Sequence, residues 1–124
     1  MSLTDRFMDA LHHLDRTGET GPMAQLFHAD ATLRRMAQRH VYDRVHAFWR
    51  DYLSAFDEVR TEFHDAHAAD GRVVLEWTSR GTLSNGHPFD YDGVSVLEVE
   101  GERVAAFRAY YDCAALLPPS PAAP

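Results

Sequence analysis

The stretch from residue 72 to residue 112 constrains the fold of this chain more than any other feature. It holds three long runs rich in β-branched and aromatic residues, separated by turn signals at Asn85-Gly86 and at Gly101, and a fourth run ends at Asp70-Gly71. Tight turns between such runs predict an antiparallel sheet. The runs are about twice the usual strand length of about 5 to 6 residues, and long strands must twist and bend. Gly93, inside the third run, is a candidate position for a bulge or bend.

The residues before these runs predict three helices and a short strand. Ser2 and Asp5 resemble a capping box at the start of the first helix. Its apolar face, spaced by three or four residues, holds Leu3, Phe7, Leu11 and Leu14. Gly21-Pro22 begins a second helix, residues 31–36 read as a short strand, and residues 43–56 as a third helix. Because only these helices can cover the concave side of a bent sheet, we expect a pocket between the two layers.

Composition and charge exclude several classes of partner. The 124 residues suit one domain, which we expect over residues 1–116, with a disordered proline-rich tail over residues 117–124. The net charge of −7 leaves no basic surplus for phosphates, so we expect neither nucleic acid nor a membrane as a partner. The sequence has no apolar run of about 20 residues and no signal-peptide pattern at its start. Cys113 is the single cysteine, which fits a cytoplasmic location.

Side-chain alternation predicts which residues of the sheet face the helices. Trp77 and Tyr91 each belong to the more apolar face of their run. With a three-residue turn at Gly101, the expected cross-strand pairs are Leu97 with Ala105, Ser95 with Phe107, and Tyr91 with Tyr111, which brings the apolar sets together. A two-residue turn at the preceding Asn-Gly would instead put Asp90 and Asp92 on the side of Trp77 until a bulge reversed the faces.

The inward face of the first long strand depends on the length of the turn that follows it. A three-residue turn would set Phe63 beside Trp77 and bring Asp65 and His67 inward. A two-residue turn would reverse the strand and bring His64 inward instead. Asp65 and His67 are two residues apart, hence on one face, and an inward pair would suit acid/base chemistry. The alternative is an edge-strand pair that faces water.

Several segments, taken in order, carry a resemblance to a known family. They are Leu26-Phe27-His28-Ala29-Asp30-Ala31-Thr32-Leu33, Phe48-Trp49, Glu76-Trp77-Thr78-Ser79-Arg80-Gly81-Thr82, Gly93-Val94-Ser95-Val96-Leu97-Glu98-Val99, and Arg108-Ala109-Tyr110-Tyr111-Asp112. Together they resemble the SnoaL-like proteins of the nuclear-transport-factor-2-like, ketosteroid isomerase-like superfamily, over roughly residues 3–116. The resemblance implies a cystatin-like α+β roll, in which a cone-shaped, curved antiparallel (mixed) sheet wraps on three amino-terminal helices. It also implies an apolar pocket and a homodimer through the outer sheet face.

The catalytic residues known in this superfamily are absent from the matching positions. Where ketosteroid isomerases carry two aspartates and a tyrosine, this chain has Arg35, Ser95 and Ala10. Where limonene epoxide hydrolases carry an arginine and two aspartates, it has Trp77, Ser79 and Ala109. The resemblance therefore predicts the fold without selecting a reaction.

The predicted pocket wall is mainly aromatic. Its residues are Phe7, Leu11, Arg35, Trp49, Tyr52, Phe63, Trp77, Ser79, Tyr91, Ser95, Phe107 and Tyr111. Such a set is typical of a site for a small apolar or aromatic ligand, and the alternative interpretation is a solid core. Arg35 is a candidate to bind an anionic group at the pocket mouth, or else lies at the surface.

Two classes of function remain open. The first is an isomerase, cyclase or lyase that acts by proton transfer, with Asp65, His67 and Tyr91 as candidate catalytic residues. The second is non-catalytic, either a ligand carrier or sensor, or a homodimeric protein-interaction module. The histidines lack the spacing of a zinc site, and no phosphate-binding loop or nucleophile motif is present, so we expect neither a metal nor a cofactor.

Overall fold

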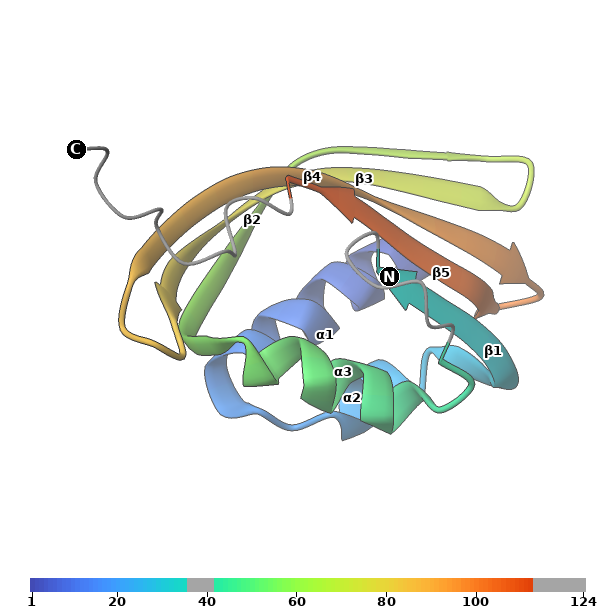
Figure 1. Ribbon diagram of the computed structural model, residues 1–124. Helices are drawn as coiled ribbons and strands as arrows, with labels where there is room; N and C mark the ends of the chain where they lie inside the picture. Colours follow the sequence, from blue (N-terminus) through green and yellow to red (C-terminus); the bar gives the residue numbers. More distant parts are fainter. Residues whose placement is uncertain (36–41, 113–124) are drawn as a thin grey trace.

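The computed structural model describes residues 1–35 and 42–112; the proposed tail at 117–124 and Cys113 lie outside this part. Its elements are α1 (Leu3–Thr17), α2 (Gly21–Ala24), β1 (Phe27–Arg35), α3 (Val45–Ser54), β2 (Phe56–Ala69), β3 (Arg72–Leu83), β4 (Pro88–Glu100) and β5 (Arg103–Tyr111). The strands form one curved, unclosed sheet that arches over the helices (Figure 1). The predicted α+β architecture, a curved sheet on amino-terminal helices, is confirmed.

The strand order explains why the sheet is mixed. The order is β1-β5-β4-β3-β2, in which β1 runs parallel to β5 and every other neighbouring pair is antiparallel. The first strand is longer than the predicted 31–36, because it begins at Phe27, whose ring is buried in the core. The third helix is shorter than predicted, since Phe56 already belongs to β2.

Local sequence determines both ends of α1. The Ser2 hydroxyl accepts a hydrogen bond from the Asp5 amide, and the Asp5 carboxylate accepts one from the Ser2 amide, so the capping box is present. Gly18 ends the helix in the left-handed conformation, with φ of 77°. The helix packs Phe7, Ala10, Leu11 and Leu14 toward the sheet.

The β2–β3 hairpin corrects one prediction about the site. Its turn has two residues, since Ala69 pairs with Arg72, and a register shift between Phe63 and Asp65 then sets Phe63 beside Trp77. Because of this bulge, Phe63 lies beside Trp77 as expected, but Asp65 and His67, on the other side of the bulge, do not face the helices. The expected inward placement of Asp65 and His67 is therefore wrong. The two side chains are 52% and 73% exposed and contact each other at 3.0 Å.

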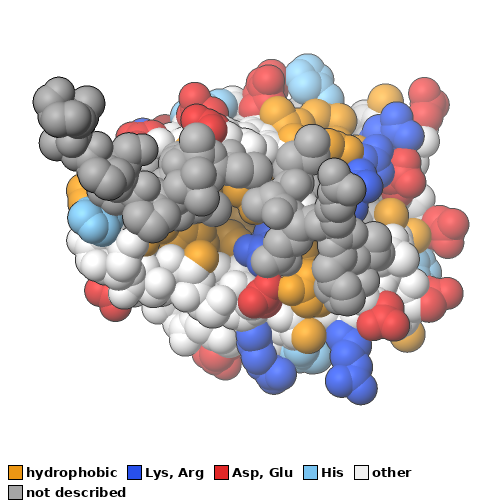
Figure 2. Space-filling model, in the orientation of Figure 1, with side chains coloured by type: hydrophobic (Ala, Val, Ile, Leu, Met, Phe, Trp, Pro, Cys, Tyr) orange, Lys and Arg blue, Asp and Glu red, His pale blue; other side chains and the backbone are white. Residues whose placement is uncertain are grey.

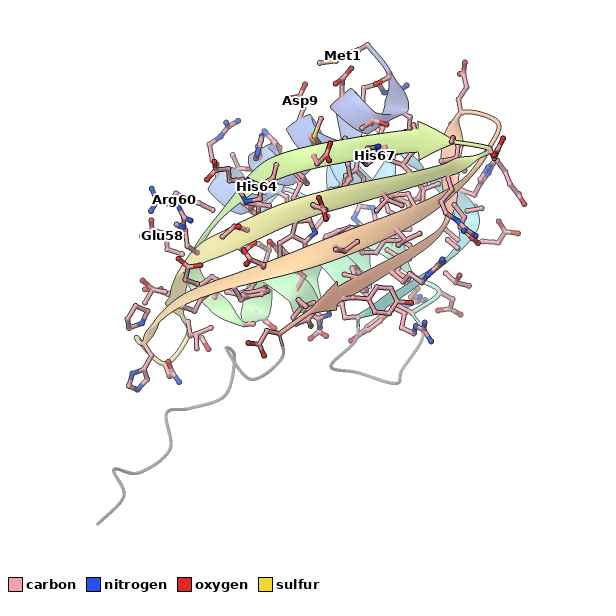
Figure 3. All side chains as sticks on the ribbon, turned by 90° about the horizontal axis from the view of Figure 1, so that it is seen from above. Met1, Asp9, Glu58, Arg60, His64 and His67 are labelled. Atoms are coloured by element: carbon pink, nitrogen blue, oxygen red, sulfur yellow. The ribbon has the colours of Figure 1, made fainter. Side chains whose placement is uncertain are left out.

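The alternative inward placement of His64 is not observed either. His64 Nε2 lies 2.6 Å from the hydroxyl of Thr78. Thr78 is next to Trp77 on β3 and therefore points to the opposite, convex face of the sheet. Figure 3, which views the sheet from above, shows His64 and His67 along β2, an edge strand of the sheet.

The two remaining hairpins leave the predicted inner faces of β4 and β5 intact. Tyr91 pairs with Ser79 on the concave side, which leaves Asp90 and Asp92 on the convex side. The turn at Gly101 has two residues rather than three, and a register shift follows between Glu98 and Val99. As a result Leu97 pairs with Phe107, Ser95 with Ala109, and Gly93 with Tyr111. The predicted pairs are wrong by two positions, but an even shift keeps Ser95, Phe107 and Tyr111 on their predicted face.

Gly93 makes room for an indole ring and does not form a bulge. The β3–β4 register runs through the Trp77–Gly93 pair without a shift. A Cβ atom at Gly93 would lie 2.4 Å from the Trp77 ring, far inside van der Waals contact. The missing side chain therefore allows Trp77 to lie across the concave face.

Candidate functional site

A pocket lies between the concave face of the sheet and the helices. Its wall is formed by Phe7, Leu11, Arg35, Phe48, Trp49, Tyr52, Phe56, Thr61, Trp77, Ser79, Tyr91, Ser95, Phe107, Ala109 and Tyr111. The empty volume is about 520 Å³ including the open mouth, of which about 40 Å³ admits the centre of a water molecule. That inner space exceeds what one water needs. Figure 2 shows hydrophobic side chains gathered in a hollow on this face of the molecule.

Aromatic rings pack against one another around the pocket in stacked, tilted and edge-to-face pairs. Phe107 stands at the centre of one cluster, 5.7 Å from the Phe7 ring, 5.2 Å from Trp49 and 5.7 Å from Phe48. A second cluster joins Trp77 to Tyr91 at 5.7 Å and Tyr91 to Tyr111 at 5.4 Å. Such contacts hold large rings in fixed orientations and give the pocket an apolar wall.

Trp77 is held by a hydrogen bond as well as by packing. Its Nε1 donates to Oγ of Ser95 at 2.9 Å, across the β3–β4 pair. Both residues are buried and both line the pocket. The bond satisfies the indole donor and fixes the orientation of the ring above Gly93.

A charged group enters the pocket from the end of β1. Arg35 is only 9% exposed, and its Nη2 donates to Asp51 Oδ2 at 2.8 Å. The Tyr42 hydroxyl donates to the same Asp51 oxygen, and this contact raises the pKa of Tyr42 together with burial. The Arg35 guanidinium carbon lies 5.5 Å from the centre of the Phe48 ring. The cation is thus held by a carboxylate on one side and an aromatic face on another.

A second polar group lies on the α1 side of the pocket. The Asp15 carboxylate accepts hydrogen bonds from Tyr52 at 3.0 Å and from Thr61 at 2.8 Å. The Thr61 hydroxyl also lies 3.1 Å from that of Ser79. His12 Nε2 donates to the Thr61 carbonyl at 3.0 Å. Tyr52, Thr61 and Ser79 line the pocket, so their hydroxyls connect it to Asp15.

Burial changes the acidity of this group. It raises the pKa of Asp15 from 3.8 to about 6, against the lowering effects of the Thr61 and Tyr52 hydrogen bonds and of His12. The pKa of Tyr52 is raised well above 10.0, chiefly by burial and then by the negative charge of Asp15. Near neutral pH the group therefore combines a neutral tyrosine with a carboxyl that is close to its own titration point.

Most residues of the predicted wall meet at this pocket, and three predicted site residues do not. Those that line it are Phe7, Leu11, Arg35, Trp49, Tyr52, Trp77, Ser79, Tyr91, Ser95, Phe107 and Tyr111. Phe63 lies outside the wall and packs its ring 5.4 Å from His12. Asp65 and His67 are also outside it, exposed on the β2 edge strand.

The prediction missed the two carboxylates that hold the polar wall residues in place. Asp15 follows Leu11 by four residues, so the spacing placed it on the buried stripe of α1 beside the pocket. Asp51 follows Phe48 by three residues on α3. The sequence gives no sign that Asp51 belongs to the site, because its partner Arg35 comes from a distant strand. The spacing of Asp15 was therefore the sequence feature from which a polar site could have been predicted.

Two other kinds of feature are absent from the described part of the chain. Within residues 1–35 and 42–112, no three His, Cys, Asp or Glu side chains gather in a group that could hold a metal ion. In the same residues, no helix is long and apolar enough to cross a membrane.

Solved structures with the same fold are numerous. A hypothetical protein with a ketosteroid isomerase-like fold from Catenulispora acidiphila, in complex with trimethylamine, aligns with a TM-score of 0.79 at 18% identity, over 90% of this chain and 88% of the other. IdmH, a putative polyketide cyclase from Streptomyces antibioticus, aligns with 0.75 at 17%, over 94% and 96%. An M. tuberculosis LEH-like epoxide hydrolase aligns with 0.70 at 15%, over 92% and 83%. These identities show a shared fold and no more.

The chain has the fold of proteins described as nuclear-transport-factor-2-like and ketosteroid isomerase-like. No curated protein matches the sequence. The SnoaL-like domain model matches residues 4–107, and the chain belongs to this family.

Proposed function

We propose that the protein binds a small, largely apolar or aromatic molecule in the pocket beneath the concave face of the sheet. The observation that carries this proposal is the pocket wall itself, which combines two clusters of aromatic rings with a few oriented polar side chains. Concave sites with that composition are typical of small-molecule binding. A solid core would need no open mouth and no buried arginine at its edge.

A cavity-filling variant tests this proposal. Ala109 lines the pocket, and Ala109→Leu would add three carbons to the enclosed space. Ala106 lies on the same strand with its side chain on the convex face, so Ala106→Leu is the matched control. Mass spectrometry would identify the small molecules that co-purify with each protein. We expect the same molecule with the unmodified protein and with Ala106→Leu, and much less of it with Ala109→Leu. Equal recovery from all three would contradict the proposal.

Catalysis by proton transfer is a second candidate, favoured by one observation. Asp15 has a pKa of about 6 and accepts hydrogen bonds from two hydroxyls of the pocket wall. In this proposal Asp15 is a positioning residue, and Tyr52, Ser79 or Tyr91 contacts the ligand. Among the proteins that share the fold, a putative polyketide cyclase and an epoxide hydrolase-like protein are consistent with an enzyme of the isomerase, cyclase or lyase type. Asp65 and His67 have no part in it, since they lie away from the pocket.

Deuterium incorporation separates the enzyme from a carrier or sensor. The co-purifying molecule would be incubated with the protein in deuterated water and then recovered for mass spectrometry. An enzyme that moves a C–H proton returns labelled or converted material, and Asp15→Asn should lower the labelling rate, because the wall hydroxyls lose the carboxylate that orients them. A carrier returns the molecule unchanged and unlabelled, which would eliminate the catalytic role.

We also propose that two copies pair through the convex face of the sheet in the cytoplasm. Val94 and Tyr110 are paired across β4 and β5 on that face, with Val96 nearby, and all three are half-buried in the single chain. We expect the unmodified protein to sediment as a dimer and the Val96→Glu variant to sediment as a monomer. A monomeric unmodified protein at high concentration would contradict the pairing.

A further inference from the structure

Two hydrogen-bond donors of the pocket wall have no acceptor among the described residues. They are Nε of Arg35 and Nε1 of Trp49. Arg35 is 9% exposed and Trp49 is 2% exposed, and both line the pocket. Buried donors in native proteins are almost always paired, because an unpaired one loses its bond to water and gains nothing. A group outside the described residues is therefore expected to accept these bonds.

The second tryptophan of the pocket shows that the unpaired donor is specific to Trp49. Trp77 lies in the same pocket wall, and its Nε1 donates to Ser95. The described residues thus supply an acceptor for one indole and leave the other open. The two open donors come from the end of β1 and from α3.

Contacts among the described residues hold the Arg35 guanidinium and leave its Nε–H without an acceptor. Asp51 binds Nη2, and the Phe48 ring lies against the guanidinium plane. The Phe48 ring also contacts Trp49, with the two ring centres 4.9 Å apart. Both open donors therefore belong to residues that pack on Phe48. A fixed guanidinium whose Nε–H has no acceptor among the described residues is suited to bind an oxygen acceptor.

We infer that the molecule bound in the pocket carries a carbonyl or carboxylate oxygen on an apolar, planar body, with the oxygen directed at Arg35 and Trp49. This inference rests on the proposed binding function and adds the chemical class of the ligand. The aromatic clusters hold the body, and the open donors hold the oxygen. A cationic amine is disfavoured, because it would bring a second positive charge to Arg35 and has no acceptor to offer.

Four probes of similar size and shape test the chemical class. They are toluene, acetophenone, benzoate and benzylamine, each titrated into ¹⁵N-labelled protein. We expect acetophenone, benzoate or both to bind roughly ten- to a hundredfold more tightly than toluene, as for a hydrogen bond to a charged donor. Whichever of acetophenone and benzoate binds more tightly shows whether the natural ligand carries a carbonyl or a carboxylate oxygen. Benzylamine should bind no better than toluene.

The side-chain N–H signals of the unmodified protein report the contact directly. The chain has two tryptophans, so Trp49→Phe assigns both indole signals. Acetophenone or benzoate should shift the Trp49 Nε1 and Arg35 Nε signals by much more than toluene does. The Trp77 signal is the internal control, because its donor is already bonded to Ser95.

Variants supply the second measurement. Arg35→Met and Trp49→Phe should each remove most of the preference for the oxygen-bearing probe while leaving toluene affinity within about threefold, as expected when a specific hydrogen bond is lost and apolar contact is kept. Arg34→Met is the matched control, since Arg34 neighbours Arg35 on β1 but is exposed and contacts Tyr110.

The outcomes separate the two proposals. Toluene binding as tightly as acetophenone and benzoate, benzylamine binding best, or unmoved Trp49 and Arg35 signals in the bound protein would overturn the inference and leave the pocket function standing. If none of the four probes perturbs any pocket residue at millimolar concentration, the proposed binding function fails, and the inference fails with it.

Discussion

Replacing Asp15 with asparagine is expected to change how stability depends on pH. The folded protein raises the pKa of this carboxyl from 3.8 to about 6, so the folded state binds its proton more tightly than the unfolded state does. Stability therefore falls as pH rises from about 4 to about 6, and the loss is complete above that range. A rise of about two pH units corresponds to about 3 kcal/mol.

The magnitude can be measured as a difference between proteins. The asparagine side chain of the Asp15→Asn variant does not titrate, so the pH-dependent loss of stability at this position disappears. The free energy of unfolding of Asp15→Asn minus that of the unmodified protein should therefore increase by about 3 kcal/mol between about pH 4 and pH 7. Any constant cost of altered hydrogen bonds to Tyr52 and Thr61 cancels in this comparison. Urea unfolding followed by tryptophan fluorescence at several pH values gives the required free energies.

The matched control is Asp9→Asn on the same helix. Asp9 is exposed, and its substitution changes the net charge by the same amount as Asp15→Asn. We expect the Asp9→Asn curve to run nearly parallel to that of the unmodified protein. If the Asp15→Asn and Asp9→Asn curves have the same pH dependence, the carboxyl is not buried as described and the reasoning is refuted.

Three further variants test the packing and the helix cap. Gly93→Ala should displace the Trp77 ring, destabilise the fold by about 1–3 kcal/mol and shift the tryptophan emission, and an unchanged spectrum would argue against the close contact. Ser2→Ala removes the cap of α1 and should cost about 1 kcal/mol in urea unfolding, whereas Thr4→Ala, in the first turn but outside the cap, should cost less. Leu75→Ala, at a fully buried site, should cost about 2–5 kcal/mol, and a loss below about 1 kcal/mol would mean that the core there is not tightly packed.

The residues on the inner face of the sheet were predictable because side chains alternate between the two faces, so a register error of two positions leaves each side chain on the same face. The predicted partners of Leu97 and Ser95 were wrong by two positions, yet both side chains lie on the predicted face. The same logic failed on β2, where a bulge beside His64 changes the parity by one. Such a bulge has no local signature in the sequence, so the orientation of Asp65 and His67 could not be predicted from the sequence.

The polar part of the site was the least predictable. Asp15 had the spacing of a buried position, but aspartate is rarely buried, and only its hydroxyl partners on α3 and β2 make that position tolerable. The Arg35–Asp51 pair joins β1 to α3. In the sequence these two elements are separated by residues that have no clear hydrophobic periodicity. Sequence patterns locate apolar faces well and locate hydrogen-bonded partners poorly, because partners are set by tertiary packing.

The parallel pairing of β1 with β5 has a consequence for biosynthesis. Among the described strands, β1 pairs with β5, which is made after all the others, so β1 joins the sheet after translation reaches Tyr111. β5 also supplies Phe107 and Ala109 to the pocket. Until β5 has been made, the nascent chain therefore keeps apolar surface uncovered, a situation in which chaperones and premature association compete with folding.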